Sequence, residues 1–137
     1  MEISSELLEE IVAHTLEDPR NEVCGVVAVA EDGSPSARAV RVHRATNVHA
    51  SPLKFEIEPK ELIALYNAIE AEGHTLGAIY HSHVRSDPYP SQTDVNFAAN
   101  WPGVEWIIVG LASGQEPKVR SYLIAHGEVR EVPLRAG

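Results

Sequence analysis

The stretch that most constrains the fold of this chain is His81-Ser82-His83, which directly follows the apolar run Leu76 to Tyr80. A run of this kind is typical of a buried strand. Side chains alternate between the two faces of a strand, so His81 and His83 point the same way, with Cα atoms roughly 6.5 Å apart. Two imidazole rings at this separation can bind one metal ion. We therefore expect residues 75–83 to form the central strand and to end at a site.

A carboxylate arrives eleven residues after the second histidine, in Ser91-Gln92-Thr93-Asp94. Two histidines and one aspartate leave the fourth position of a tetrahedral ion open, as in a catalytic rather than a structural zinc site. Each part also has a simpler interpretation. The Ser91 to Asp94 segment has the form of a helix capping box, and a His-x-His pair alone is a weak motif. Taken singly, these residues leave both interpretations open.

A third group joins this pattern through Glu22, which precedes the valine-rich run Cys24 to Ala30. Alone, Glu22 reads as a surface carboxylate beside a loop. At the start of a second central strand, however, it could reach the same cleft as the histidines. A hydrolytic metal site needs a base that takes a proton from water and passes it to the leaving amine. It also gains from a hydroxyl donor for the oxyanion, and here Ser91 is the candidate.

The remaining pattern alternates helix and strand signals over 137 residues, which favours one domain spanning 1–137. Pro59 is typical of a first helical turn, and Gly73 of the residue after a helix end. We expect an α/β or α+β fold with a mixed central sheet flanked by helices. The expected helices cover residues 6–16, 59–72 and 91–99, and the expected strands cover 22–30, 37–45, 55–57, 75–83, 104–111, 119–125 and 129–134.

Composition narrows the possible partners and the compartment. A net charge of -9 argues against a nucleic-acid partner, which would select a basic surface. The apolar runs are strand-sized and shorter than a membrane span, and the acidic N-terminus lacks the basic start of a signal peptide. The single cysteine, Cys24, cannot form an internal disulfide and suits a reducing cytoplasm. We expect Cys24 to be buried packing rather than a nucleophile.

Together, Glu22-x-Cys24-Gly25, His81-Ser82-His83 and Ser91-x-x-Asp94 resemble the signature of the JAMM (MPN+) metalloproteases. The resemblance spans essentially the whole chain and implies a cytidine-deaminase-like fold. It also implies cleavage of amide or isopeptide bonds at the C-terminal tail of ubiquitin-like β-grasp proteins. The roles that it implies are a Zn2+ ion held by His81, His83 and Asp94, a general acid/base at Glu22 and an oxyanion stabiliser at Ser91.

Two details direct the resemblance toward small bacterial members of the family. Val84 follows the second histidine, where many members have proline. Two segments are similar to those of hydrolases that release cysteine from the C-terminus of a sulfur-carrier protein. They are residues 89–95 and Arg120-Ser121-Tyr122. The resemblance thus implies a ubiquitin-like sulfur-carrier protein with a Gly-Gly C-terminus as the partner, and cysteine as the product.

Three alternatives stay open at the level of sequence. The chain could act as a general deconjugase of lysine-linked conjugates, which share the same scissile carbonyl. It could be a non-catalytic interaction module on the same fold. It could also be a different metalloenzyme, because His81 and His83 with Asp87 faintly resemble a cupin site. Against a cupin, no second histidine motif follows on a later strand.

Overall fold

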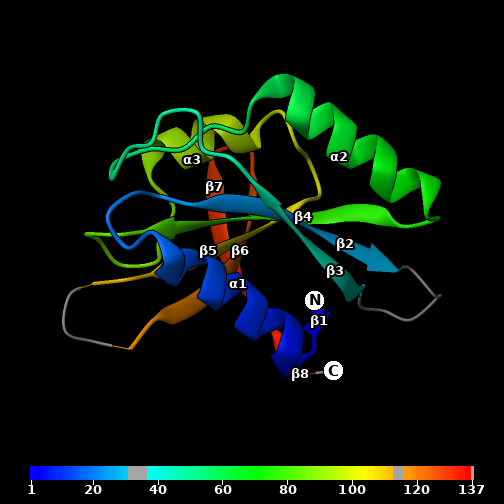
Figure 1. Ribbon diagram of the computed structural model, residues 1–137, viewed down its shortest axis with the longest axis horizontal. Coiled ribbons are helices and arrows are strands. Elements are labelled where there is room, and N and C mark those ends of the chain that lie inside the picture. Colours follow the sequence, from blue (N-terminus) through cyan, green and yellow to red (C-terminus); the bar gives the residue numbers. More distant parts are fainter. Residues whose placement is uncertain (31–36, 113–115, 137) are drawn as a thin grey trace.

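An eight-stranded mixed sheet forms the centre of the computed structural model, which describes residues 1–30, 37–112 and 116–136 (Figure 1). Its order is β7-β6-β5-β4-β2-β3-β1-β8, so β4 lies in the interior, between β2 and β5. The strand that carries both histidines is therefore central, as expected. The strands are β1 (Glu2–Ile3), β2 (Cys24–Ala30), β3 (Arg38–Ala45), β4 (Thr75–His83), β5 (Glu105–Gly110), β6 (Lys118–Ala125), β7 (Glu128–Val132) and β8 (Arg135–Ala136).

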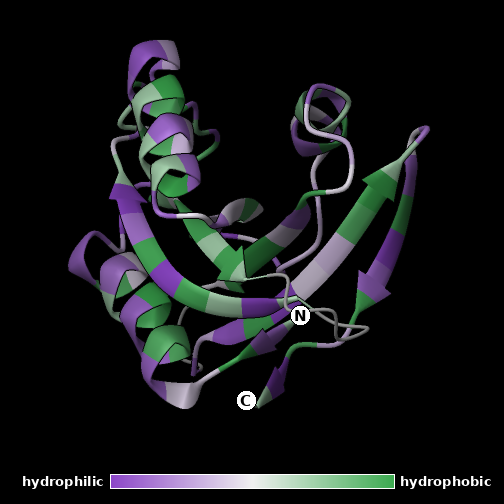
Figure 2. Cartoon of the chain, turned by 90° about the vertical axis from the view of Figure 1, so that its right-hand side faces the viewer, coloured by the Kyte–Doolittle hydropathy of each residue, from purple (hydrophilic) through white to green (hydrophobic). Residues whose placement is uncertain are grey.

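The sheet is strongly curled, and the chain itself brings its two edges together. Strands β7 and β8 lie at opposite edges, yet only residues 133 and 134 separate them in sequence. A connection this short cannot cross a flat sheet of eight strands, so the sheet bends round on itself (Figure 2). The first residue helps to hold this closure, because the Met1 amino group donates to the Pro133 carbonyl at 3.3 Å.

Three helices cover the sheet, with α1 (Ser5–Glu17) on one face and α2 (Pro59–Ala71) and α3 (Gln92–Ala98) on the other (Figure 1). Each helix begins where the sequence predicts. The Ser4 hydroxyl caps α1 by accepting from the Leu7 N–H at 3.2 Å. Pro59 occupies the first turn of α2, and Gly73 follows that helix with a φ of 79°. Local signals are thus sufficient to fix these helix ends.

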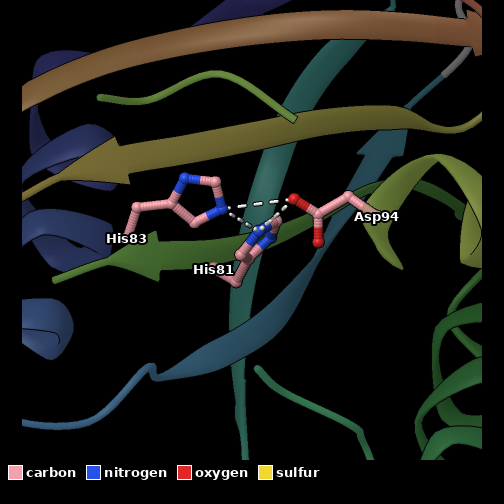
Figure 3. A group of neighbouring side chains, drawn as sticks. All are labelled: His81, His83 and Asp94. Carbon is pink, nitrogen blue, oxygen red and sulfur yellow. Dashed lines mark hydrogen bonds and ion pairs between the residues drawn. The ribbon is translucent and has the colours of Figure 1, made fainter. Parts of the chain in front are cut away.

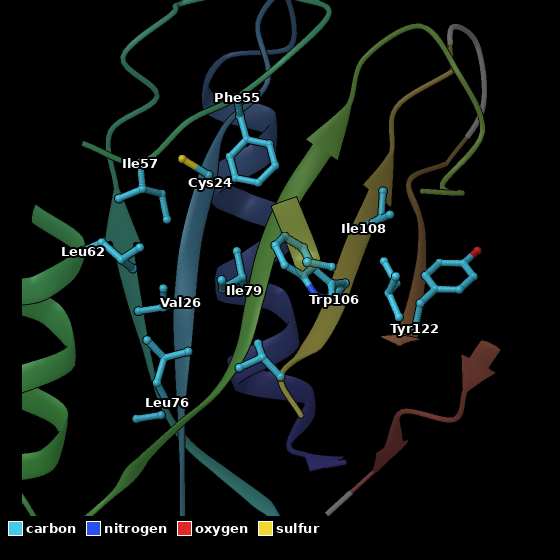
Figure 4. Close-up of a cluster of buried hydrophobic side chains, with 14 of the residues drawn as sticks. Cys24, Val26, Phe55, Ile57, Leu62, Leu76, Ile79, Trp106, Ile108 and Tyr122 are labelled. Carbon is cyan, nitrogen blue, oxygen red and sulfur yellow. The ribbon is translucent and has the colours of Figure 1, made fainter. Parts of the chain in front are cut away.

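The two faces of the sheet bury separate apolar clusters. Alternation along β4 sends Ala78 and Tyr80 toward α1, and Ile79 and His81 toward α2 and α3. The cluster on the α2 and α3 side includes Ile79, Trp106 and Ile108 from neighbouring strands (Figure 4). Because β4 pairs with β5 so that His81 stands opposite Ile108, the histidines emerge at the rim of this cluster.

One predicted strand is wrong. Residues 55–57 do not join the sheet and make only an isolated bridge between Asn47 and Ile57. The segment meets the chain at Asn47, beyond the end of β3, rather than β3 itself, although β1 occupies that edge of β3 only at Arg38. The alternation of Phe55 and Ile57 instead reflects burial of both side chains in the apolar cluster on the α2 and α3 side of the sheet. The two-residue strands β1 and β8 are additions that no sequence pattern of such length could predict.

The other expectations agree with the structure. The mixed sheet flanked by helices confirms the predicted fold class. Cys24 is fully buried, and burial raises the pKa of its thiol to about 12, which makes it inert. The turn signals at Asp32-Gly33 and Ser113-Gly114 lie outside the described residues. Within the described ranges, no helix has the length and apolar character needed to span a membrane.

Gly25 provides a test of this packing. A Cβ atom at Gly25 would overlap the ring of Tyr80, which is fully buried and bonded through its hydroxyl to His14 Nδ1 at 2.6 Å. We expect Gly25→Ala to lower the free energy of unfolding by about 3 kcal/mol, measured by urea denaturation. The same change should cost much less in a Tyr80→Leu background, where the ring is absent. Equal costs in the two backgrounds would contradict the assignment.

Candidate metal centre

Three buried side chains converge at the end of β4. His81 Nε2 lies 3.1 Å from His83 Nε2, and Asp94 Oδ2 lies 3.2 Å from each of these nitrogens (Figure 3). The exposed fractions of the three residues are 0%, 5% and 4%. The structure therefore brings together all three ligands that the sequence predicts, as a nearly equilateral triangle of potential ligand atoms.

Asp94 reaches this triangle because it also starts a helix. Its Oδ2 accepts from the Ser91 N–H at 2.9 Å, and the Ser91 hydroxyl accepts from the Asp94 N–H at 3.1 Å. This is a complete capping box at the start of α3. The capping interpretation of the segment is thus confirmed, and the same residues place the Asp94 carboxylate beside the histidines. The reciprocal bonds fix the Asp94 rotamer and direct its carboxylate at the histidines.

The loop between β4 and α3 orients His83. The Nδ1 atom of His83 lies 3.0 Å from the Asp87 carbonyl, so it carries the hydrogen and leaves Nε2 with a lone pair. Pro88, the residue after Asp87, is fixed by a further hydrogen bond, because the Tyr122 hydroxyl donates to its carbonyl. Gly110 gives this loop its room, since a Cβ there would lie 2.7 Å from Pro88 Cδ. The loop thus fixes the tautomer of His83 from outside the strand.

His81 is held by packing instead. Its ring stacks on Phe55 with a centroid distance of 4.3 Å and an interplanar angle of 22°. Its Nδ1 atom is buried, and no described residue provides a hydrogen-bond partner for it. A metal-bound histidine usually donates its second ring N–H to a carbonyl or carboxylate. Here Phe55 takes over the orienting role, which explains why this loop residue is buried beside the site.

The charges of the three side chains follow from this packing. Burial lowers the pKa of His81 more than the attraction of Asp94 raises it, so this imidazole is neutral. Burial also opposes the charge on His83, but its bonds to Asp94 and the Asp87 carbonyl raise its pKa overall. Burial would raise the pKa of Asp94, but His81, His83 and the Ser91 N–H together lower it. The Asp94 carboxylate is therefore charged and lies beside a neutral His81 and a His83 whose affinity for a proton is increased.

These properties fit a divalent metal ion. Tetrahedral zinc with ligands at 2.0–2.1 Å places them about 3.3 Å apart, close to the 3.1–3.2 Å separations in this triangle. The donor set of two imidazoles and one carboxylate is that of hydrolytic zinc sites, and a bound cation would compete with a proton at His83 Nε2. His81, His83 and Asp94 could therefore hold a metal ion together.

Glu22 is placed beside this triangle by the pairing of β2 with β4. Ser82 makes two hydrogen bonds with Val23, the residue after Glu22. The Ser82 hydroxyl accepts from the Val23 N–H at 3.0 Å, and the Ser82 N–H donates to the Val23 carbonyl at 3.1 Å. Glu22 is only 6% exposed. Burial raises the pKa of Glu22 to about 7. Repulsion by Asp94 also raises this pKa, whereas attraction by His83 lowers it. A carboxyl group tuned near neutrality suits proton transfer.

Ser91 and Asp87 have contrasting positions. Ser91 is exposed, and its hydroxyl accepts from Asp94 while keeping its own hydrogen available to donate. It therefore lies at the open side of the site. The Asp87 side chain is exposed and takes no part in the described cluster of potential metal ligands. Only its main-chain carbonyl approaches His83, which removes the basis for a cupin-like ligand set.

Asn47 is a residue of the site region that sequence reasoning missed. Its Nδ2 donates to the carbonyls of Glu22 and Lys54, both at 3.0 Å. Its Oδ1 accepts from the N–H groups of His49 and Glu56, both at 3.1 Å. All four hydrogen bonds of the amide are thereby made. Asn47 closes the loop that carries Phe55 and ties it to the main chain of Glu22. In the sequence, Asn47 stands only at the start of a loop, and no local pattern indicates these long-range bonds.

We expect Asn47→Ala to loosen this loop while leaving the sheet folded. Four main-chain groups lose their hydrogen-bond partner, two of them in partly buried bonds, which should lower the free energy of unfolding by about 2 kcal/mol. Hydrogen exchange followed by mass spectrometry should show faster exchange for residues 48–56 and unchanged exchange in β5 and β6. Asn100→Ala, at an exposed asparagine after α3, is the matched control. Unchanged protection of residues 48–56 would refute the role of Asn47.

Comparisons with known sequences identify relatives over most of this chain. Residues 4–125 match the family described as prokaryotic homologs of the JAB domain. The CysO-cysteine peptidase of Mycobacterium tuberculosis is 32% identical over 132 residues, 96% of this chain and 88% of the relative. The desampylase of Haloferax volcanii is 38% identical over 114 residues, 79% of this chain and 78% of the relative. A probable TtuB-protein conjugate cleaving protease of Thermus thermophilus is 35% identical over 123 residues, covering 89% and 74%.

Solved structures show the same fold. A protein of Desulfitobacterium hafniense has a TM-score of 0.87 and 27% identity, with 99% of this chain and 92% of that chain covered. A JAB1/MPN domain protein of Archaeoglobus fulgidus has a TM-score of 0.65 and 18% identity, with 100% and 96% covered, which supports the fold alone. The resemblance inferred from the sequence is thus confirmed, and the chain belongs to the prokaryotic JAB domain family as a hydrolase of the JAB/MPN type.

Proposed function

We propose that this hydrolase is zinc-dependent and cleaves the amide bond after the C-terminal Gly-Gly tail of a ubiquitin-like sulfur-carrier protein. His81, His83 and Asp94 hold the zinc ion, Glu22 is the general acid/base, and Ser91 stabilises the oxyanion. Residues 1–137 act as one catalytic domain in the cytoplasm. The observation that carries the proposal is the buried triangle of ligand atoms 3.1–3.2 Å apart, with a carboxyl group of pKa about 7 beside it.

The roles of the protein groups follow from their positions. Zinc in this site would polarise the scissile carbonyl and lower the pKa of a water molecule. Glu22 accepts the proton that the attacking water loses and then delivers it to the departing nitrogen. A pKa of about 7 suits both steps, since Glu22 must take and release a proton in each cycle. The free hydrogen of the exposed Ser91 hydroxyl donates to the carbonyl oxygen as it becomes negative.

Two leaving amines are candidates. The name of the mycobacterial relative contains cysteine, which supports release of cysteine from the carrier tail. The Thermus relative is named for cleaving protein conjugates, which supports the alternative of a general deconjugase acting on lysine side chains. Both amines are joined to the same tail and require the same chemistry at Glu22. The alternative of a non-catalytic interaction module has less support, because this chain belongs to a hydrolase family and has all three residues of the ligand triangle.

We expect Glu22→Gln to bind zinc normally and to abolish turnover. A carrier ending in Gly-Gly-Cys and the same carrier linked to lysine would be followed by intact mass, with and without a chelator. Zinc content by atomic spectroscopy is the control for the site itself. Loss of one ligand in His83→Ala should instead lower both zinc content and activity. Turnover by Glu22→Gln at the wild-type rate would contradict the assignment of Glu22 as the general acid/base.

Glu22 also predicts a pH dependence of stability in the metal-free protein. Its pKa rises from an ordinary 4.5 to about 7 on folding, so the folded state binds the extra proton between these values. Stability is therefore full below pH 4.5 and falls as pH rises through 7. Relative to Glu22→Gln, the wild type should lose about 3 kcal/mol between pH 4 and pH 8, measured by urea unfolding in chelator. Parallel pH profiles for the two proteins would disprove this.

A further inference from the structure

A cavity of about 240 Å³ adjoins Glu22 outside the metal triangle. None of the three potential ligands lines it, although they are all in the described part of the chain. It lies between the C-terminal end of α1, the loop before β2 and the segment after β3. The polar residues that line it are His14, Asp18, Asn21, Glu22, Thr46 and Asn47.

The proposed reaction assigns this cavity a position along the substrate. A general acid must come within hydrogen-bonding distance of the nitrogen that it protonates. The leaving amine therefore departs on the side of Glu22, while the carrier tail occupies the side of Ser91. A cavity that opens at Glu22 is the space into which the rest of the leaving group extends. This step of the inference rests on the proposed function.

The electrostatics of the cavity are negative. Asp18 is the C-terminal cap of α1, and its carboxylate accepts from the N–H groups of Arg20 and Asn21 at 3.3 and 3.2 Å. The C-terminal end of a helix carries a partial negative charge, and here it adds to the charge of Asp18. A negative group entering the cavity would meet both, together with the carboxylate form of Glu22.

The two side-chain amides that line the cavity already donate to other groups. Asn21 Nδ2 donates to Asp18 Oδ2 at 3.3 Å, and Asn47 Nδ2 serves two main-chain carbonyls. Among the described residues, no lysine or arginine lines the cavity. Arg44, which precedes the lining residue Ala45, is paired with Glu17 at 2.6 Å. Burial lowers the pKa of His14, whose Nδ1 is engaged by the Tyr80 hydroxyl, so this ring is neutral.

We propose that this cavity is the subsite for the leaving amine, and that Asp18 makes it select against amines with a free carboxylate next to the nitrogen. Such a carboxylate would enter beside Asp18 without a cation to balance it. An alkyl amine whose carboxyl group lies in a peptide bond, such as a lysine side chain within a protein, brings no such charge. The structure thereby favours the second of the two leaving amines.

The test compares substrates that differ only in this carboxylate. One Gly-Gly carrier would be joined through its terminal carboxyl group to cysteine, to cysteamine, which is cysteine without its carboxylate, or to Nζ of acetyl-lysine methylamide. We expect the zinc-loaded protein to cleave the cysteamine and lysine adducts with a kcat/KM about tenfold above that of the cysteine adduct. Asp18→Asn should raise kcat/KM for the cysteine adduct alone by about fivefold, because one nearby charge is removed.

Binding provides a readout that is independent of turnover. In zinc-loaded Glu22→Gln, the Kd of the cysteine adduct should exceed that of the cysteamine adduct. Adding Asp18→Asn should reduce the ratio of these two Kd values. Asp87→Asn is the matched control, since this exposed carboxylate lies near His83 but lines a different cavity. It should leave the preference unchanged.

The outcomes separate this inference from the proposed function. Equal kcat/KM for the cysteine and cysteamine adducts, or an equal effect of Asp18→Asn on both, would overturn the subsite while leaving the hydrolase assignment standing. A cysteine adduct that is cleaved fastest would overturn it as well. If zinc-loaded protein cleaves none of the three adducts, the proposed function itself fails, and the subsite falls with it.

Discussion

A single carboxylate oxygen holds the site together. Oδ2 of Asp94 accepts the Ser91 N–H at 2.9 Å and stands 3.2 Å from both imidazole nitrogens. The same atom therefore starts α3 and completes the ligand triangle. Helix capping is a local interaction of neighbouring residues, so the sequence around Ser91 itself specifies it. The same reciprocal bonds hold the Asp94 carboxylate in the direction of the histidines.

The alternation along β4 explains why the histidines are separated by a serine. His81 and His83 face α2 and α3, so Ser82 faces the opposite way, toward the start of β2. There its hydroxyl and main chain hold Val23, and Val23 carries Glu22 to the site. Residues 81–83 thus place two potential ligands on one face of the sheet. On the other face, Ser82 positions Glu22 by holding Val23. A residue without a hydroxyl between the histidines would leave the Val23 N–H without this acceptor.

Sequence reasoning succeeded where an interaction is local and failed where it spans the chain. The capping box at Ser91, the helix start at Pro59 and the strand ending at His83 depend on neighbouring residues, and all are confirmed. Residues 55–57 show strand-like alternation, but the tertiary fold decides which segment lies beside them, and no local pattern encodes that. The stacking of Phe55 on His81 was invisible for the same reason.

Two unfavourable features of the structure lie at this site. Glu22 is buried with a raised pKa, and His81 Nδ1 lacks a described partner. A network that served stability alone would pair a buried carboxylate with a cation, which lowers its pKa. Here burial dominates and the pKa moves the other way. A protein keeps such a group when reactivity near neutral pH matters more than the stability that it loses. The destabilised Glu22, next to a triangle of potential metal ligands, is therefore independent physical support for a hydrolytic role.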